Sequence, residues 1–294
     1  MAKKKLTAKE LATYIDLHGD VLHQPEIPIC RESAPYGRAY YQDQEEFKDR
    51  EFLPSPTTIL QCLEKGIGFQ KWLCSHTWDS SREFANFRAW MGTMTHILCS
   101  HLLWGKQITI GNGFYNEKTD QIEPIPFEVQ KRLGGFINFL EEYNPVPLGS
   151  EVMLYTNKKT TIDGKEFYRY PFAGTLDYLF YADLDGKGEK LIYCDLKTGK
   201  EHKKEHELQC TAYKILFDVI YGEKYGTIDQ IGCLYIKDTG RWKWQPYKFV
   251  PDAWYSVYDT WKYLHTDGWG KLPKIKEKPV MPDKYVWERE CEDE

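Results

Sequence analysis

The chain has 294 residues, of which 41% are hydrophobic, and this is long enough to bury a substantial core in one large domain or two modest ones. Its 39 basic and 44 acidic side chains give a net charge of -5, so the total charge does not itself indicate nucleic-acid binding, although local patches can still provide it. No run approaches the roughly 18 apolar residues of a membrane-spanning helix, so we expect a soluble, cytoplasmic protein with no membrane partner.

Eight cysteines are scattered through apolar segments, and no two of them form a C-x-x-C pair. This spacing is typical of reduced thiols in a cytosolic protein and argues against a zinc or iron-sulfur site. The cysteines are at positions 30, 62, 74, 99, 194, 210, 233 and 291.

The first part of the chain combines a predicted helix at 8–23 with a polar, turn-rich stretch, and we treat 1–50 as an extension leading into the fold. From Ser55, a Ser/Thr cluster beside a proline predicts the start of a helix. The hydroxyls of Ser55, Thr57 and Thr58 either cap that helix or hold a phosphate at its N-terminus, and both interpretations stay open. The apolar stripe of this helix consists of Ile59, Leu60 and Leu63.

A longer helix is predicted at 80–105, and a further one at 126–143. His96 lies among the apolar residues of the first of these. Because a lone histidine beside an apolar stripe is more often a core residue than a metal ligand, its spacing alone favours packing. The predicted apolar side consists of Phe84, Phe87, Met91, Met94, Ile97, Leu98 and Leu102.

The rest of the chain reads as a sheet with two more helices. A strand is predicted from Glu151 to Tyr155, and β-rich runs at 174–182 and 191–198 surround a polar turn, which is the pattern of an antiparallel hairpin. The remaining expected elements are a helix at 205–221, strands at 229–237 and 242–250, and a helix at 252–264. We expect one domain to span 51–270, followed by a charged, proline-containing tail at 271–294.

The predicted hairpin carries an acid on each strand. Asp195 and Lys197 are two residues apart, so the strand period directs both side chains to one face of the sheet. Asp177 shares that face only if it pairs opposite Asp195, because a slip of one residue moves a side chain to the other face. We expect that register, reached through a loop of odd length or a bulge.

The pattern acid-x-Lys carries little information by itself, because it occurs five times in this chain. The copies of the pattern that begin at 163 and 185 contain glycine and are typical of turns, while the copies that begin at 46 and 201 lie in charge-rich segments. Only Asp195-Leu196-Lys197 ends an apolar strand, which is where charged side chains can face a cleft.

Two carboxylates that converge from adjacent strands form an oxygen-rich site suited to Mg²⁺ or Mn²⁺. A neighbouring lysine can then orient or deprotonate a water molecule that attacks a phosphoryl group. The alternative is a surface ion pair between Asp195 and Lys197, and spacing alone leaves both interpretations open.

The order of four motifs resembles that of the PD-(D/E)XK nuclease superfamily, in its RecB-type exonuclease branch. The preceding segment GRAYYQDQEEFKDREFLPSPTTILQ, with Trp72 after it, is similar to that of phage exonucleases and mitochondrial genome maintenance exonucleases. The resemblance covers about residues 37 to 215. The four motifs are Gly92-x3-His96, Gly174-Thr175-Leu176-Asp177, Asp195-Leu196-Lys197-Thr198-Gly199-Lys200 and Gln209-x3-Tyr213.

This resemblance implies an α/β fold with a restriction-endonuclease-like PD-(D/E)XK core, in which helices flank a central mixed β-sheet, and with an N-terminal helical region. It implies that His96, Asp177, Asp195 and the main-chain carbonyl of Leu196 bind Mg²⁺ or Mn²⁺, and that Lys197 is the catalytic lysine. The implied activity is that of a metal-dependent DNA exonuclease in phage or mobile-element DNA replication, recombination or repair.

The resemblance also assigns Gln209 and Tyr213 to a helix that lines the site and positions the substrate backbone, and these residues share a helix face. Glu151 is a further acid that we do not include among the expected site residues. CRISPR-associated members of this branch hold an iron-sulfur cluster with a group of C-terminal cysteines. Here Cys291 stands alone in the tail, so we expect no cluster.

The expected partner is DNA, with a homo-oligomer or a replication or recombination protein as a further partner. Basic residues that either contact phosphates or lie on a solvated surface are Lys65, Lys71, Lys158, Lys159, Lys200, Lys203 and Lys204. One alternative is a catalytically silent nucleic-acid-binding or interaction module on the same fold. Another is a metal site at His202 and His206, which lacks an evident third ligand.

Overall fold

The structure is a computed structural model, and it describes residues 29–34, 37–42, 51–116, 120–156, 160–162, 165–168 and 171–265. The predicted helix at 8–23, the tail at 271–294, Lys158, Lys159 and Cys291 lie outside these residues. No helix in the described part of the chain is long and apolar enough to cross a membrane.

A small antiparallel sheet comes first in the described chain. It contains β1 (Ile29–Ala34), β2 (Gly37–Gln42) and β3 (Leu53–Pro54), in that spatial order. Tyr40 and Leu53 pack with Ala173 of the central sheet in a small buried cluster. The small sheet is therefore fixed against the larger one.

The helix predicted from Ser55 is much shorter than expected. Ser55 caps α2 (Pro56–Ile59) by accepting a hydrogen bond from the backbone N–H of Thr58, and a 3-10 turn, η2 (Leu60–Cys62), follows. The chain then leaves the helical conformation at Leu63, before α3 (Ile67–Cys74). Ile59 and Leu60 are buried, so the first turn is anchored although the helix does not continue.

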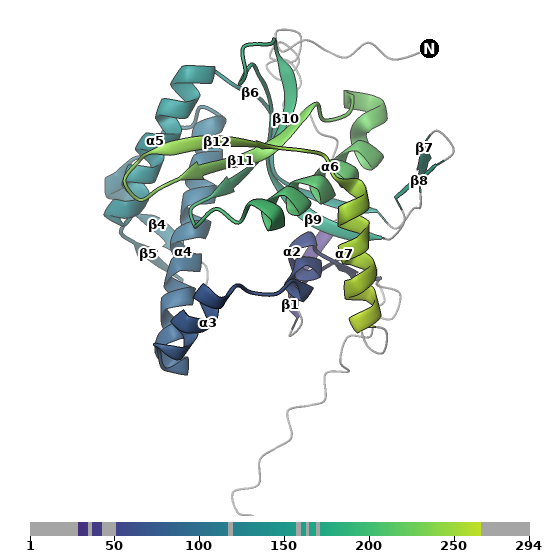
Figure 1. Ribbon diagram of the computed structural model, residues 1–294. Helices are drawn as coiled ribbons and strands as arrows, with labels where there is room; N and C mark the ends of the chain where they lie inside the picture. The colour runs from purple at the N-terminus through teal and green to yellow at the C-terminus, as the bar shows by residue number, and fades with distance from the viewer. Residues whose placement is uncertain are drawn as a thin grey trace, which may run out of the picture.

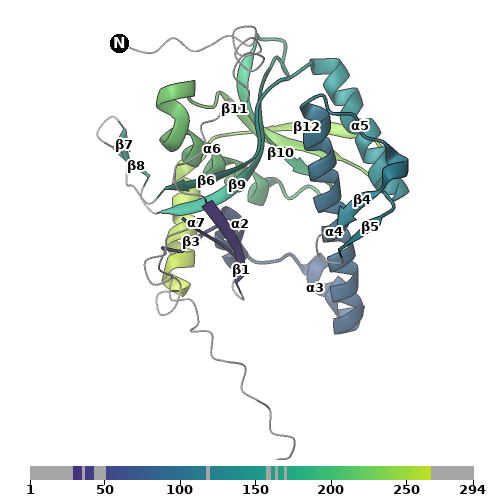
Figure 2. The ribbon, with the colours of Figure 1, turned by 180° about the vertical axis from the view of Figure 1, so that it is seen from behind.

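The helix predicted at 80–105 is confirmed as α4 (Trp78–Leu103). Its predicted apolar side is wrong in the N-terminal half, because Phe84 and Phe87 are 51% and 53% exposed. Figures 1 and 2 show the reason, since this half of α4 extends with α3 beyond the edge of the sheet. Met91, Met94 and Leu98, further along, are buried as predicted.

The central sheet has five strands in the order β12-β11-β10-β9-β6, and it is mixed, as predicted. The strands β10 and β11 are parallel and are connected through α6, whereas the other neighbours are antiparallel. The bounds of these strands are β6 (Val146–Thr156), β9 (Phe172–Ala182), β10 (Lys190–Lys197), β11 (Gln230–Ile236) and β12 (Trp242–Tyr247).

Helices cover both faces of this sheet (Figures 1 and 2). One buried cluster joins α4 and α5 to one face, and another joins α6 and α7 to the other. The chain is thus a three-layer α/β structure in which strand residues alternate between two cores. The covering helices besides α4 are α5 (Phe127–Tyr143), α6 (Lys203–Tyr225) and α7 (Pro251–Leu264).

One 3-10 turn and two short hairpins complete the described chain outside these layers. They are η3 (Ile110–Asn112), the hairpin of β4 (Phe114–Asn116) and β5 (Gln121–Glu123), and the hairpin of β7 (Thr160–Ile162) and β8 (Lys165–Tyr168).

The hairpin of β9 and β10 has the register that the sequence predicts. Residues 183 to 189, seven in all, connect the strands, so the loop is of odd length. Leu179 pairs with Tyr193 and Tyr178 with Cys194, which is the register that would place Asp177 opposite Asp195. The regular pairing ends one step before the two acids, where the strands can separate around a site.

Candidate functional site

Three acids lie in one row across three neighbouring strands. Ser150 pairs with Tyr178 and Val152 with Leu176, so Glu151 of β6 is opposite Asp177 of β9. Asp195 of β10 is next in the same row by the hairpin register. We call Glu151, Asp177 and Asp195 the acid row. Asp195 pairs with Cys233 of β11, whereas Glu151 and Asp177 lie between the ladder pairs of β6 and β9.

The strands β6 and β9 exchange faces at the acid row. Tyr178 packs in the core under α4 and α5, whereas Leu176 packs in the core under α6 and α7, although residues two apart in a regular strand share a face. Their partners behave alike, because the Ser150 hydroxyl bonds to α4 while Val152 packs toward α6. Glu151 has a φ of +51°, an unusual conformation for a residue other than glycine.

The exchange of faces brings Asp177 toward α4, where it meets His96. The distance from His96 Nδ1 is 3.4 Å to Asp177 Oδ2 and 3.8 Å to Glu151 Oε1. The buried Tyr178 hydroxyl donates to the backbone carbonyl of His96 at 2.9 Å, which fixes this turn of α4 against β9. The resemblance and the geometry therefore agree that His96 faces the acids and is not a core residue.

The two carboxylates create a strong negative field at the imidazole. Burial alone lowers the pKa of His96, but the charges and hydrogen bonds of Asp177 and Glu151 outweigh burial and raise it to about 10. Ligand atoms of His96, Glu151 and Asp177 lie within 4.8 Å of one another, and no other such group of three is found among the described residues. Such a group offers one nitrogen and two oxygen atoms as ligands that a cation could use.

Asp195 belongs to a second, more buried arrangement with Lys197. Its Oδ2 lies 2.6 Å from Lys197 Nζ, while Gln209 of α6 donates to its Oδ1 and accepts from Lys197, each at 3.1 Å. The hydroxyl of Tyr193 also donates to Asp195 Oδ1, at 3.1 Å. Burial opposes the charge on Lys197, but Asp195 outweighs burial and raises the lysine pKa above its ordinary value, so Lys197 is an ammonium.

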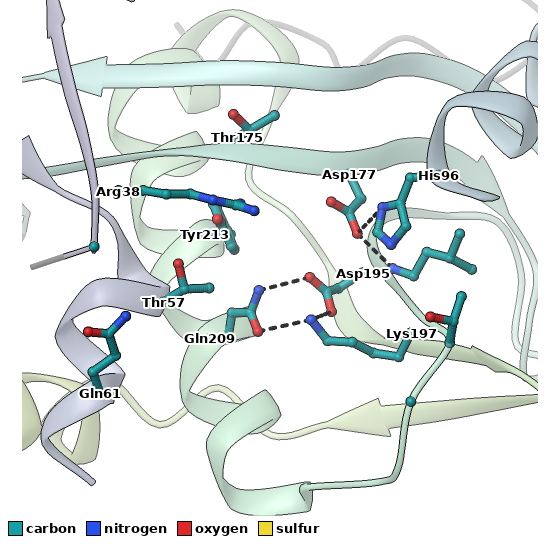
Figure 3. Close-up of a pocket in the computed structure, with 14 residues that line it drawn as sticks. Arg38, Thr57, Gln61, His96, Thr175, Asp177, Asp195, Lys197, Gln209 and Tyr213 are labelled. Atoms are coloured by element: carbon teal, nitrogen blue, oxygen red, sulfur yellow. Dashed lines mark hydrogen bonds and ion pairs between the residues drawn. The ribbon is translucent and has the colours of Figure 1, made fainter. Parts of the chain in front are cut away.

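A backbone hydrogen bond links the two arrangements. The N–H of Leu196 donates to Asp177 Oδ2 at 2.9 Å, across the point where the strands separate (Figure 3). Leu196 lines the cleft with its main chain while its side chain is buried in the core under α4 and α5. Asp177 is therefore held from both sides, by α4 and by the end of β10.

Gly174 explains how α6 approaches the sheet closely enough for Tyr213 to reach the site. A Cβ atom at Gly174 would lie 2.6 Å from Tyr213 Cε1, so no larger residue fits without displacing the ring. Tyr213 is 4% exposed and packs against Tyr193 with ring centroids 5.4 Å apart. The glycine of the motif Gly174-Thr175-Leu176-Asp177 thus has a packing role, three residues before the acid.

The predicted site residues line one cleft of about 510 Å³. His96, Asp177, Asp195, Leu196, Lys197, Gln209 and Tyr213 all contribute to it. Figure 3 shows Asp177, Asp195, Lys197 and Gln209 at one side, and Arg38, Thr57 and Gln61 at the other. The structure therefore brings together every residue that the resemblance assigns to the site.

Two contributions to the site lie outside the four sequence motifs. Glu151 completes the group with His96 and Asp177, and its signal was its place on the strand that precedes the hairpin. Arg38 and Gln61 line the opposite wall together with Thr57, which the sequence offered as a helix cap or a phosphate ligand.

The other sequence-based candidates take different positions. The hydroxyls of Ser55 and Thr58 bond to each other at 2.9 Å, and Thr58 also bonds to the carbonyl of Arg38, which favours capping over phosphate binding. Lys65 pairs with Glu205 and Lys204 with Glu207 at the surface. His206 is buried and bonds to the Tyr235 hydroxyl, and no third metal ligand joins it among the described residues.

Comparisons with known proteins identify no family. No protein-family model and no curated protein matches the chain. One solved structure, described as "Crystal structure of SSO0001", aligns with 45% of this chain at 18% identity and a TM-score of 0.27. The alignment spans 56% of that chain, and a likeness at this level carries no argument about activity.

Proposed function

We propose that this protein is a metal-dependent DNA exonuclease with a PD-(D/E)XK core, which hydrolyses phosphodiester bonds from a DNA end. The observation that carries the proposal is the acid row, because it joins Asp177 and Asp195 in one cleft with His96 and Lys197. The order of the four sequence motifs supports the same assignment. So does the hairpin followed by a helix and a parallel strand, β9-β10-α6-β11.

The residues present fit a divalent cation. One imidazole nitrogen and two carboxylates lie within 4.8 Å of one another, and carboxylates with few nitrogen ligands suit Mn²⁺ and Mg²⁺. We infer that His96, Asp177 and Glu151 hold the cation, with Asp195 and the Leu196 carbonyl at the adjoining edge. A divalent cation supplies a polarised phosphoryl oxygen and a water molecule of lowered pKa.

The chain's own residues supply charge and orientation for the reaction. In phosphodiester hydrolysis a water oxygen bonds to phosphorus, one ester P–O bond breaks, and the departing oxygen takes up a proton. Because Asp195 keeps Lys197 in the ammonium form, Lys197 can donate hydrogen bonds to the attacked phosphate, where negative charge develops. We therefore propose that Lys197 stabilises the negative charge on the attacked phosphate and does not remove a proton from the water.

Gln209 and Tyr213 position these groups from α6. Gln209 contacts both members of the Asp195–Lys197 pair, so it fixes the direction of the ammonium. Tyr213 forms the wall between the acids and the Arg38 side of the cleft. We infer that both residues align the reacting groups without exchanging protons with the substrate.

An end-labelled oligonucleotide assay tests the proposal. Wild-type protein should release labelled nucleotides in Mg²⁺ or Mn²⁺ and none in EDTA, while Asp195→Ala and Lys197→Ala should lose at least about a hundredfold in rate. Equal rates in the three proteins would sink the proposal. Metal-insensitive binding without cleavage would favour the silent binding module. A circular substrate, which has no end, should resist cleavage if the action is exonucleolytic.

A further inference from the structure

Arg38 is a cation of the cleft that has no ion-pair partner among the described residues. It extends from β2 into the cleft beside Tyr213, opposite the acid row (Figure 3). The other two cations of the cleft are engaged, His96 by Asp177 and Glu151, and Lys197 by Asp195. Among the residues that the structure describes, no acidic group pairs with the Arg38 guanidinium, and its side chain is exposed in the cleft.

The backbone beneath Arg38 is fixed, in contrast to its side chain. The carbonyl of Arg38 accepts hydrogen bonds from the Ser55 N–H at 3.2 Å and from the Thr58 hydroxyl at 2.9 Å. Gly37 has a φ of +121°, and a Cβ atom there would lie 2.5 Å from Thr58 Oγ1. Only glycine allows this approach, so the capped turn of α2 holds Arg38 at one place on the wall.

The strand beyond Arg38 is anchored as well. Ala39 and Tyr40 are 2% and 1% exposed, and the Tyr40 hydroxyl bonds to Thr175 of β9 at 3.0 Å. Thr175 lies two residues before Asp177, so the base of Arg38 is tied to the strand that carries the central acid. The backbone of Arg38 is thus fixed while its guanidinium stays available to bind a ligand.

We propose that Arg38 binds a phosphate group of the nucleic-acid substrate, on the wall of the cleft opposite the acid row. The planar guanidinium offers two parallel N–H donors that match phosphate oxygens, and it keeps its charge at every working pH. The Thr57 hydroxyl and the Gln61 amide on the same wall provide further hydrogen-bonding groups. This inference rests on the proposed function, since it names the anion that the cleft accepts.

Two kinds of phosphate share this chemistry, the terminal monoester of a strand and an internal phosphodiester. Oligonucleotides with a 5′-phosphate, a 3′-phosphate or hydroxyls at both ends separate them. If Arg38 holds a terminal group, wild type prefers one phosphorylated end, and Arg38→Ala removes the preference. If Arg38 holds an internal phosphate, the substitution weakens all three strands equally.

The test is binding of a fluorescein-labelled single strand in EDTA, followed by anisotropy over a range of salt concentrations. Arg38→Ala should bind about tenfold more weakly, and its slope of log affinity against log salt should fall by about 0.7. Arg38→Lys should keep the slope but lose part of the affinity, because it keeps the charge and loses the planar fork. The matched control is Arg241→Ala, an exposed arginine outside the cleft, which should bind as wild type does.

The outcomes separate this inference from the proposed function. If Arg38→Ala binds like Arg241→Ala, or if wild type binds no strand at all, the inference is overturned. Cleavage by wild type together with unchanged Arg38→Ala binding would leave the nuclease proposal standing and remove the role of Arg38. If binding depends on Arg38 but wild type does not cleave in Mn²⁺, the role of Arg38 stands and the nuclease proposal falls.

Discussion

The carboxylate of Asp195 and the ammonium of Lys197 lie 2.6 Å apart, and the Asp195 side chain is only 2% exposed. A buried carboxylate that loses its partner keeps an uncompensated charge, which is the costly part of breaking such a pair. The pair therefore links the stability of the fold to the chemistry of the cleft.

We predict that Lys197→Met lowers the free energy of unfolding by about 1–3 kcal/mol, less than for a fully buried pair because Lys197 is 22% exposed. Urea denaturation of wild type, Lys197→Met, Asp195→Asn and the double variant measures this as a double-mutant cycle. The stability losses of the two single variants should add up to more than the loss of the double variant. In the double variant, Asp195→Asn removes the buried carboxylate charge that Lys197→Met leaves without a partner. Strictly additive losses would show that the two side chains are not coupled.

Gly174 should be intolerant of a side chain. We predict that Gly174→Ala destabilises the protein by about 1–3 kcal/mol, because its Cβ would overlap the Tyr213 ring at 2.6 Å and force α6 outward. Thermal unfolding measures the loss.

A glycine on α5 provides the control for this substitution. Gly134 is an exposed helical residue, and a Cβ there meets nothing within 4 Å. Gly134→Ala should therefore be neutral or stabilise by about 0.5–1 kcal/mol. If both substitutions have the same effect, the close packing of Tyr213 on Gly174 is not the cause.

The contribution of His206 to the stability of the fold should fall as the pH drops from neutral to mildly acidic. Burial, assisted by the charge of Lys197, lowers the pKa of His206 to about 4, below the value of about 6.5 for an exposed histidine. Between these values the unfolded chain binds a proton that the folded chain does not, so stability is lost as pH falls through this window. His206 should then remove about 2 kcal/mol of stability between pH 7.5 and pH 5.

Urea denaturation at the two pH values checks this contribution. The change between pH 7.5 and pH 5 should be about 2 kcal/mol smaller in His206→Phe than in wild type. His101, an exposed histidine at the end of α4, serves as the control, and His101→Gln should behave as wild type does. An identical pH dependence in wild type and His206→Phe would contradict the assignment.

Glu151 should contribute to cation binding although it lies outside the four sequence motifs. Its carboxylate shares the group of ligand atoms within 4.8 Å with His96 and Asp177. Glu151→Gln should raise the Mn²⁺ concentration for half-maximal cleavage by at least about tenfold. Glu141→Gln, at an exposed position of α5, should leave that concentration unchanged. Equal metal requirements in both variants would remove Glu151 from the site.

Sequence patterns predicted the hairpin of β9 and β10 and its register up to the acids, because period-two alternation and an odd loop length define them locally, whereas the central mixed sheet was implied by the resemblance. The resemblance, and not the spacing, indicated His96, Gln209 and Tyr213 as residues that line the site with the acids. The exchange of faces at Asp177 and Glu151 could not be predicted, because alternation rules assume a regular strand. It is this exchange that brings Asp177 to α4, which carries His96.

Other features depend on contacts between distant segments. The exposure of Phe84 and Phe87 follows from α4 extending past the sheet, which no helical periodicity reveals. Arg38 gave no signal, because its position depends on hydrogen bonds from Ser55 and Thr58 to its backbone. Such tertiary contacts decide which polar residues line a cleft.

The most direct test of the nuclease proposal is the rate at which Asp177→Asn cleaves an end-labelled strand in saturating Mn²⁺. The substitution keeps the size of the side chain and removes the charge at the centre of the acid row. Asp252→Asn, at an exposed position of α7, is the control. We predict at least a roughly hundredfold loss for Asp177→Asn and wild-type cleavage for the control; cleavage by Asp177→Asn at the wild-type rate would contradict the account.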